Sequence, residues 1–290
     1  MATVAREAGA QDVRTTLMYA GAIAGRPRLD FPDPANSNIA LDPHEVTIRD
    51  GRPFAGVHTL ERNGFAFTRH RSSVAEDPVL FDQADNADQV TQDGLLAAYA
   101  EEMVAFLGDR IGAATIVPQV GSFIARTSRR ARKPTWAGTA EMVHLDYTPE
   151  AAALFLGWNA QTSGRPLPPH RAYAFIQTWR ALSPGPQDNS LAICDGASVP
   201  PSDGVEIDTV MGPADVPGKC FPFRICKYRP DHQWFYLPDM APDDLILFKG
   251  FDSREPQSMN AMHSAFDNPL AGPDAAPRRS IEARFIAFFD

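Results

Sequence analysis

The sequence predicts a mainly β fold with flanking helices, and within that class a double-stranded β-helix of the jelly-roll, cupin-like type. Three observations lead to this prediction. Short apolar runs with strand character recur from residue 172 to the end, turn dipeptides such as Asp203-Gly204 and Pro217-Gly218 separate them, and the helical patterns precede them. Regularly spaced short strands joined by turn residues are typical of sandwiches and barrels.

The overall composition is that of an ordinary globular protein. The chain has 290 residues, of which 44% are hydrophobic and 22% are charged, and its formal net charge is −9. The negative charge argues against a nucleic-acid partner, because nucleic-acid-binding surfaces carry an excess of lysine and arginine. No run of eighteen apolar residues is present, so we expect no membrane partner, and the N-terminus lacks the apolar stretch of a secretory signal. The oligomeric state stays open.

The cysteines indicate a compartment. Cys194, Cys220 and Cys226 form an odd set without C-x-x-C spacing, which favours buried reduced thiols in a cytosolic protein over soft metal ligands. We therefore expect a cytoplasmic protein. We also expect it to fold as a single domain over residues 1–290. In this prediction residues 1–85 wrap around the core, and residues 86–290 supply a helix and the jelly roll.

The expected elements follow in chain order. Extended segments are expected at residues 18–20 and 54–60, a hairpin at 42–54 with its turn at Asp50-Gly51, and a strand at 64–70. Helical spacing predicts a helix over 88–109 that ends near Gly108, with β structure at 114–127. Thr148 as N-cap, followed by Pro149 and Glu150, predicts a second helix through Gly157. Later strands are expected at 172–182, 190–194, 205–210, 220–228, 233–237, 244–248, 259–266 and 280–289.

Two distant segments combine into a candidate metal site. On a strand, residues i and i+2 project to one face, so His144 and Asp146 would point together. His263 lies 117 residues after Asp146 (263 − 146). Two imidazoles and one carboxylate on one face of a metal leave open positions, which is the facial triad of non-haem Fe(II) oxygenases. The alternative is a buried His144 hydrogen-bonded to Asp146 and a loop histidine at 263.

Arginines near the C-terminus are candidates for holding a co-substrate carboxylate. Arg278 follows His263 by fifteen residues (278 − 263) and shares a strand face with Ser280, so its guanidinium and the hydroxyl can act on one carboxylate. Arg284 has the same parity and is the second choice. Glu282 lies between them and can instead form an ordinary ion pair with either arginine. A guanidinium fork suits the far carboxylate of 2-oxoglutarate.

Candidate substrate-binding residues are Arg126 and four strand residues. The basic run 126–133 is expected to be a solvated loop for the most part, although Arg126 or Arg129 can grip an anion. An arginine inside an apolar strand is costly unless it is paired, so we expect Arg180 to face a ligand or a partner such as Asp195 or Asp252. The other three candidates, Trp179, Trp234 and Tyr236, are of a type more often found in cores.

The segments that carry these residues resemble a known family. They are His144-Leu-Asp-Tyr-Thr, Trp179-Arg180, Ser190-Leu-Ala-Ile-Cys-Asp195, Trp234-Phe-Tyr-Leu-Pro-Asp-Met240, Leu247-Phe-Lys-Gly-Phe-Asp-Ser253, His263-Ser-Ala-Phe and Pro277-Arg-Arg-Ser-Ile-Glu-Ala-Arg284. Together, from about residue 120 to the end, they resemble the gibberellin-desaturase and aspergillic-acid-hydroxylase-like group, to which a cephamycin methoxylation component also belongs.

The resemblance implies an activity and a ligand set. It implies a double-stranded β-helix that uses Fe(II), 2-oxoglutarate and O2 to hydroxylate or desaturate a small, often secondary-metabolite, substrate. By position, His144, Asp146 and His263 would bind iron, and Arg278 would hold 2-oxoglutarate. Two alternatives stay open: a non-redox jelly-roll enzyme that uses zinc or manganese, and an accessory partner of a methyltransferase.

Overall fold

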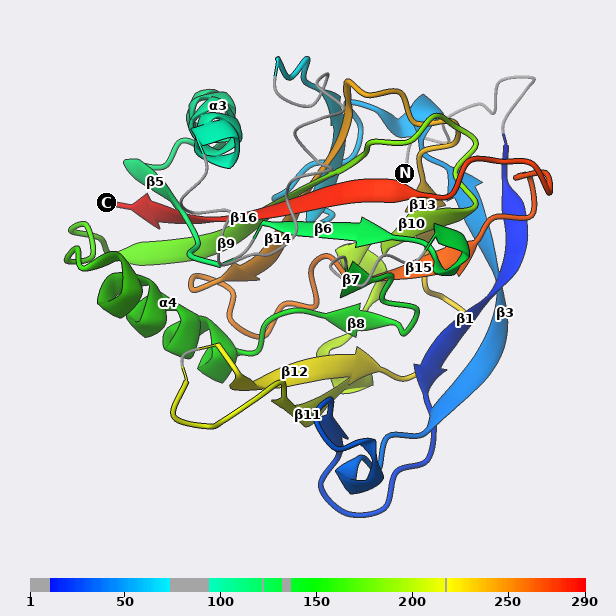
Figure 1. Cartoon of the computed structure of the whole chain (residues 1–290), viewed down its shortest axis with the longest axis horizontal. Coiled ribbons are helices and arrows are strands. Elements are labelled where there is room, and N and C mark those ends of the chain that lie inside the picture. The colour runs from blue at the N-terminus through cyan, green and yellow to red at the C-terminus, as the bar shows by residue number, and fades with distance from the viewer. Residues whose placement is uncertain (1–10, 74–93, 122, 132–136, 217) are drawn as a thin grey trace.

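Two β-sheets form the body of the molecule in the computed structural model, which describes residues 11–73, 94–121, 123–131, 137–216 and 218–290 (Figure 1). The nine-stranded sheet contains, in spatial order, β1 (Val13–Ala20), β3 (Leu41–Asp50), β13 (Trp234–Tyr236), β10 (Asn189–Cys194), β15 (His263–Asp267), β8 (His144–Leu145), β12 (Cys220–Cys226), β11 (Gly204–Val210) and β2 (Arg28–Asp30). The seven-stranded sheet contains β4 (Phe65–Arg69), β14 (Asp244–Asp252), β9 (Ala172–Ala181), β16 (Arg279–Phe289), β6 (Ile124–Thr127) and β7 (Ala137–Gly138), and β5 (Thr115–Pro118) also pairs with β16. The predicted jelly-roll class is confirmed.

The interior between the sheets is apolar where the two inner faces meet. Ile193 and Phe235 from the nine-stranded sheet pack with Trp179, Ile246 and Phe248 from the seven-stranded sheet. β9 and β16 pair antiparallel along nearly their whole lengths and are buried on both faces, although their mostly apolar sequences are interrupted by polar and charged residues. These two strands therefore form a rigid floor on which side chains of fixed parity point toward the opposite sheet.

Helix α3 (Gly94–Ile111) covers the outer face of the seven-stranded sheet, as Figure 1 shows beside β16. Tyr99, Met103 and Leu107 recur at helical spacing and pack against Ile281 and Phe285. The helix was expected over 88–109. Residues 88–93 lie outside the described part of the chain, and the helix continues past Gly108 to Ile111. It ends there because Gly112 adopts a φ of +64°.

Helix α4 (Pro149–Ser163) begins where the sequence predicts. The Thr148 side chain accepts a hydrogen bond from the backbone N–H of Ala151 at 3.0 Å, and Pro149 occupies the first turn. The helix runs beyond the predicted end at Gly157 and stops at Gly164, which has a φ of +64°. Its start fixes the direction of the chain directly after Asp146. No helix in the described residues has the length and apolar character needed to cross a membrane.

The N-terminal strands β1 and β3 pair antiparallel and lie along one side of the molecule (Figure 1). β3 adds in parallel to β13, and the backbone N–H of Val143 donates to the carbonyl of Met18 at 2.8 Å. β1 is an edge strand of the nine-stranded sheet, and this hydrogen bond joins it to the segment directly before β8, the strand that carries His144. The proposed boundary at residue 85 lies outside the described residues, and the single-domain organisation stays a prediction.

Two N-terminal predictions are wrong. The chain forms no hairpin at 42–54, because β3 is one continuous strand and a short 3-10 helix at Arg52–Phe54 follows it; the strand expected at 54–60 is replaced by this helix and turns. Gly51 is needed for a close approach and not for a hairpin turn. A methyl group at Gly51 would lie 2.8 Å from the carbonyl oxygen of Tyr236 and against the ring of Phe67.

Candidate metal centre and adjoining pocket

Three distant residues meet on the inner face of the nine-stranded sheet. His144 and His263 begin the neighbouring strands β8 and β15 and are directly opposite each other in register, and Asp146 follows β8. One ligand atom from each residue lies within 4.8 Å of the others. The Nε2 atoms of His144 and His263 are 3.8 and 3.7 Å from the two carboxylate oxygens of Asp146, and all three side chains are buried.

The imidazoles are held in the tautomer that a metal requires. Nδ1 of His144 lies 2.7 Å from the carbonyl oxygen of Met142, and Nδ1 of His263 lies 2.8 Å from that of Ala261. A carbonyl can only accept, so each Nδ1 carries the proton and each Nε2 presents a lone pair. Burial, together with the neighbouring His263, lowers the pKa of His144 to about 3. A neutral imidazole is therefore available as a ligand at any ordinary pH.

The third ligand is kept ionised. Burial by itself raises the pKa of Asp146, but the charge of the Arg284 guanidinium acts against it, and the pKa of this carboxyl lies below its usual range. Two neutral nitrogens and one carboxylate oxygen, all buried and convergent, are a donor set that suits Fe(II). The arrangement fits the metal that the sequence motif predicts.

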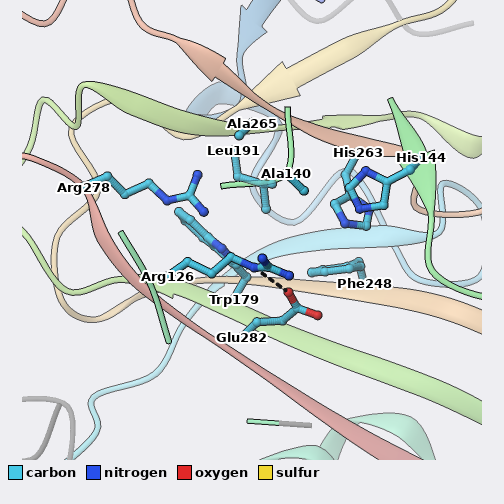
Figure 2. Close-up of a pocket in the computed structure, with 10 residues that line it drawn as sticks. All are labelled: Arg126, Ala140, His144, Trp179, Leu191, Phe248, His263, Ala265, Arg278 and Glu282. Carbon is cyan, nitrogen blue, oxygen red and sulfur yellow. Dashed lines mark ion pairs between the residues drawn. The ribbon is translucent and has the colours of Figure 1, made fainter. Parts of the chain in front are cut away.

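A pocket adjoins the histidines between the two sheets. Figure 2 shows the two histidines at one end of the pocket, beside Phe248, and the guanidinium of Arg278 at the other end, beside Trp179. The lining residues are Arg126, Ala140, His144, Trp179, Leu191, Phe248, His263, Ala265, Arg278 and Glu282. Four of the predicted co-substrate and substrate residues therefore come close to the metal ligands or to one another: Arg126, Trp179, Arg278 and, beside Arg278, Ser280.

Arg278 is buried, and no carboxylate among the described residues pairs with it. Its Nε donates to Ser280 Oγ at 3.1 Å and its Nη1 to the carbonyl oxygen of Asn189 at 2.9 Å, and the guanidinium lies 4.9 Å from the ring centroid of Trp179. Burial, and then the charge of Arg126, lowers the pKa of Arg278 to about 9. A buried cation whose partners are all neutral is suited to receive an anionic ligand.

Arg126 enters the same pocket from β6. Its Nη1 donates to the carbonyl oxygen of Gly138 at 2.8 Å, and its Nε lies 3.8 Å from Glu282 Oε2, a distance too long for a hydrogen bond. Figure 2 places its guanidinium over Glu282, between Arg278 and the histidines. Arg126 therefore faces any ligand that extends from the metal toward Arg278.

Arg284, the second choice for the co-substrate, already contacts two carboxylates. Its Nη2 lies 3.1 Å from Asp146 Oδ1, and its Nε donates to Glu282 Oε1 at 2.6 Å. It does not line the pocket. Of the two arginines, the geometry favours Arg278 for the co-substrate carboxylate, and Glu282 forms the ion pair with Arg284 that the sequence left open.

Three predicted substrate residues point elsewhere. Arg180 faces α3, the opposite side of β9 from Trp179, and neither Asp195 nor Asp252 is its partner; its Nε donates to the Tyr99 hydroxyl at 3.0 Å. Trp234 and Tyr236 flank Phe235, which is the residue of β13 in the cluster between the sheets, so they face the other side of their sheet, where a second buried cluster with β1 contains them. Trp234 donates to the Tyr19 hydroxyl and Tyr236 to the carbonyl of Gln11. Because of strand alternation, none of the three lines the pocket beside the histidines, and the geometry gives no support to their predicted substrate role.

Sequence reasoning missed two polar residues and several apolar ones. Gln177 donates from its side-chain amide to Asp146 Oδ2 at 2.6 Å, and Glu282 lines the pocket. Gln177 has the same strand parity as Trp179, which is a signal that a search for polar residues at i−2 from the tryptophan can use. Leu191, Phe248, Ala140 and Ala265 are typical core residues, and nothing in their types distinguishes a pocket wall from a core.

Comparison with known proteins identifies the family. Residues 24–288 match the oxidoreductase/YMDC permease-like domain family. The chain is 26% identical to the hydroxylase/desaturase efuI of Hormonema carpetanum, over 96% of this chain and 95% of the relative. It is 27% identical to the Fe(II)/2-oxoglutarate-dependent dioxygenase nvfI of Aspergillus novofumigatus, over 89% and 87%.

A solved structure supports the same fold. The iron and alpha-ketoglutarate-dependent endoperoxidase NvfI superimposes with a TM-score of 0.75 at 24% identity, over 96% of this chain and 98% of that one. The resemblance found in the motifs is therefore confirmed by relatives named as hydroxylase/desaturases and Fe(II)/2-oxoglutarate-dependent dioxygenases. From its match over residues 24–288, the chain belongs to the oxidoreductase/YMDC permease-like domain family.

Proposed function

We propose that this protein is an Fe(II)- and 2-oxoglutarate-dependent oxygenase that hydroxylates or desaturates an unactivated C–H bond of a small, anionic secondary metabolite. The observation that carries the proposal is the placement of two groups at the two ends of one pocket: His144 and His263, which converge with Asp146, at one end and Arg278 at the other. When bound, Fe(II) and 2-oxoglutarate supply the oxidising power, drawn from O2, that such a reaction needs.

The residues of the chain divide the remaining work. His144, Asp146 and His263 hold the metal by two nitrogens and one oxygen, which leaves positions for other ligands. Arg278 binds the far carboxylate of 2-oxoglutarate, and Ser280 and the carbonyl of Asn189 fix the guanidinium in place. Trp179 and Phe248 line the space between the histidines and Arg278, where they would exclude water and orient the co-substrate by contact.

Charge balance supports an anionic substrate. The pocket and its floor contain three guanidinium groups, those of Arg126, Arg278 and Arg284, and two carboxylates, those of Asp146 and Glu282. Fe(II) and the 2-oxoglutarate dianion together add no net charge, so one positive charge is left over. Arg278 is assigned to 2-oxoglutarate, and Arg284 already contacts Asp146 and Glu282. Arg126 has no described carboxylate at hydrogen-bond distance and lies between Arg278 and the two histidines, so we assign it to an acidic group of the substrate. The cytoplasmic location and the lack of a nucleic-acid partner stay predictions.

The activity is tested by uncoupled turnover. The protein, purified anaerobically and loaded with Fe(II), is expected to convert 2-oxoglutarate to succinate in an O2-dependent manner. His144→Ala is expected to lower this rate by about 100-fold, because it removes a metal ligand. His170→Ala is the matched control, since Nδ1 of His170 also bonds the carbonyl two residues earlier, at 2.7 Å, away from the pocket. Full turnover by His144→Ala, or a protein that holds zinc and leaves 2-oxoglutarate intact, contradicts the proposal.

A further inference from the structure

Four side chains form a closed ring of polar contacts on the metal-binding carboxylate. Arg284 Nη2 lies 3.1 Å from Asp146 Oδ1, and Arg284 Nε donates to Glu282 Oε1 at 2.6 Å. The side-chain nitrogen of Gln177 donates to the same Glu282 oxygen at 3.1 Å and to Asp146 Oδ2 at 2.6 Å. Each oxygen of Asp146 therefore has its own donor, and Glu282 ties the two donors together.

The strand register builds this ring. Arg284 and Gln177 are directly opposite each other on β16 and β9, and Glu282 is opposite Trp179, two residues along on the same face. Asp146 reaches the ring from the end of β8 in the other sheet. Two neighbouring strands thus hold their donors, Gln177 and Arg284, at fixed positions against one carboxylate. Because β9 and β16 are firmly paired, these donors limit the movement of Asp146.

A β-bulge makes room for the ring. The pairing of β14 with β9 shifts register between Lys249 and Phe251, so Gly250 is the extra residue. A methyl group at Gly250 would lie 2.7 Å from the ring of Tyr147 and against the amide oxygen of Gln177. That amide oxygen is buried and has no hydrogen-bond partner among the described residues. The amide thus gives up a hydrogen bond on its oxygen side in order to donate from its nitrogen to two carboxylates.

We infer that Gln177 and Arg284 are positioning residues that clamp Asp146, with Glu282 as their anchor, so that the carboxylate meets the metal in one fixed rotation. Carboxylates on flexible side chains can otherwise rotate between one-oxygen and two-oxygen binding, which changes the number of open positions at the metal. With one donor on each oxygen, one lone pair per oxygen is already occupied, and the orientation toward His144 and His263 is set before the metal arrives. The inference rests on the proposed metal centre.

The clamp is tested by metal affinity and spectrum, which do not depend on turnover. Co(II) is titrated into the metal-free protein and its d–d absorption is recorded. Gln177→Leu keeps the side-chain size and removes the donor, and Arg284→Lys keeps the charge and loses the fork that spans two carboxylates. Both variants are expected to bind Co(II) at least about 10-fold more weakly and to alter the absorption envelope.

Matched controls separate positioning from simple loss of a buried polar group. Gln187 is another buried glutamine, and its amide donates to the carbonyls of Ser183 and Met240. Gln187→Leu and Arg180→Lys are expected to lower the thermal unfolding temperature and to leave the Co(II) affinity within about twofold of the parent protein. His144→Ala is expected to abolish tight binding.

Each outcome decides the inference. Weak Co(II) binding by Gln177→Leu and Arg284→Lys, with normal binding by both controls, supports the clamp. Normal binding by folded Gln177→Leu, or an equal loss in Gln187→Leu, overturns the clamp and leaves the metal centre intact. If His144→Ala binds Co(II) as tightly as the parent protein, the metal centre is itself wrong, and the proposed function fails together with the clamp.

Discussion

The seven-stranded sheet buries an arginine on each face, and the two are equally hidden from solvent: 0% of Arg180 and 1% of Arg278 are exposed. Arg180 faces α3. All three of its guanidinium nitrogens have acceptors, supplied by the Tyr99 hydroxyl, the carbonyls of His70 and Pro242, and Nδ1 of His70. Arg278 faces the other sheet, and in the described residues only its Nε and Nη1 have acceptors.

Burial therefore does not distinguish a structural arginine from a ligand-binding one, but the completeness of its hydrogen bonds does. The fully satisfied guanidinium fastens a helix to a sheet and has nothing left to offer a ligand. The partly satisfied one lines a pocket that also contains metal-ligand candidates. Removing each arginine should accordingly affect different measurements.

The largest effect is expected from Arg278→Gln. Loss of a charge-assisted pair with the co-substrate carboxylate costs about 3 kcal/mol, so the KM for 2-oxoglutarate should rise by roughly 100-fold. Because a buried, unpaired cation is removed, the free energy of unfolding without co-substrate should stay close to that of the parent protein or increase. Steady-state succinate formation measures the first quantity and urea denaturation the second. A KM within threefold of the parent value would remove Arg278 from the site.

The converse is expected for Arg180→Met. The change leaves the Tyr99 hydroxyl and the carbonyls of His70 and Pro242 without their donor, which should lower the free energy of unfolding by about 2–3 kcal/mol. The KM for 2-oxoglutarate should be unchanged in the folded fraction, since Arg180 points away from the pocket. A raised KM without a loss of stability would reverse the assignment of the two arginines.

The candidate metal ligands are predictable from sequence because their chemistry is recognisable and two of them lie two residues apart. His144 and Asp146 need only strand alternation to share a face, and His263 is the distant histidine that completes a known donor set. Strand positions after residue 172 are predictable for a similar reason, since apolar runs and turn residues are neighbours in the chain. The prediction for Arg278 rests on the same alternation, which places its side chain on one strand face with Ser280.

The sequence of a strand that is buried on both faces does not tell which face meets the other sheet. β13 is buried on both faces, so Trp234, Phe235 and Tyr236 give no sign of which one meets the interior. Trp179 and Arg180 are adjacent and cannot both point into one pocket. Arg284 has the parity of Arg278, but its pairing depends on Asp146, a residue of the other sheet. These distinctions arise only from tertiary packing.

His58 limits the rule that an unsatisfied buried group marks a ligand site. Its ring is stacked on Phe54 and lies 4.4 Å, centroid to centroid, from Phe235. Its Nδ1 has no hydrogen-bond partner in the part of the chain that the structure describes, yet it does not line the pocket beside His144 and His263. A neutral imidazole tolerates a missing hydrogen bond far better than a guanidinium tolerates a missing anion. The comparison therefore applies to charged groups, and His58 should act only on stability.

The smallest effect is expected from His58→Phe, and only in acid. Burial lowers the pKa of His58 below its ordinary value of 6.5, so the unfolded chain binds a proton that the folded chain does not. The penalty is absent above pH 6.5 and grows as the pH falls toward the folded-state pKa. Between pH 7.5 and 5.5 the parent protein should lose more stability than His58→Phe, by no more than about 1.4 kcal/mol per pH unit, as measured by urea denaturation at both pH values. Identical losses would mean that His58 accepts a proton in the folded state, and that its aromatic surroundings are more open to solvent than its packing indicates.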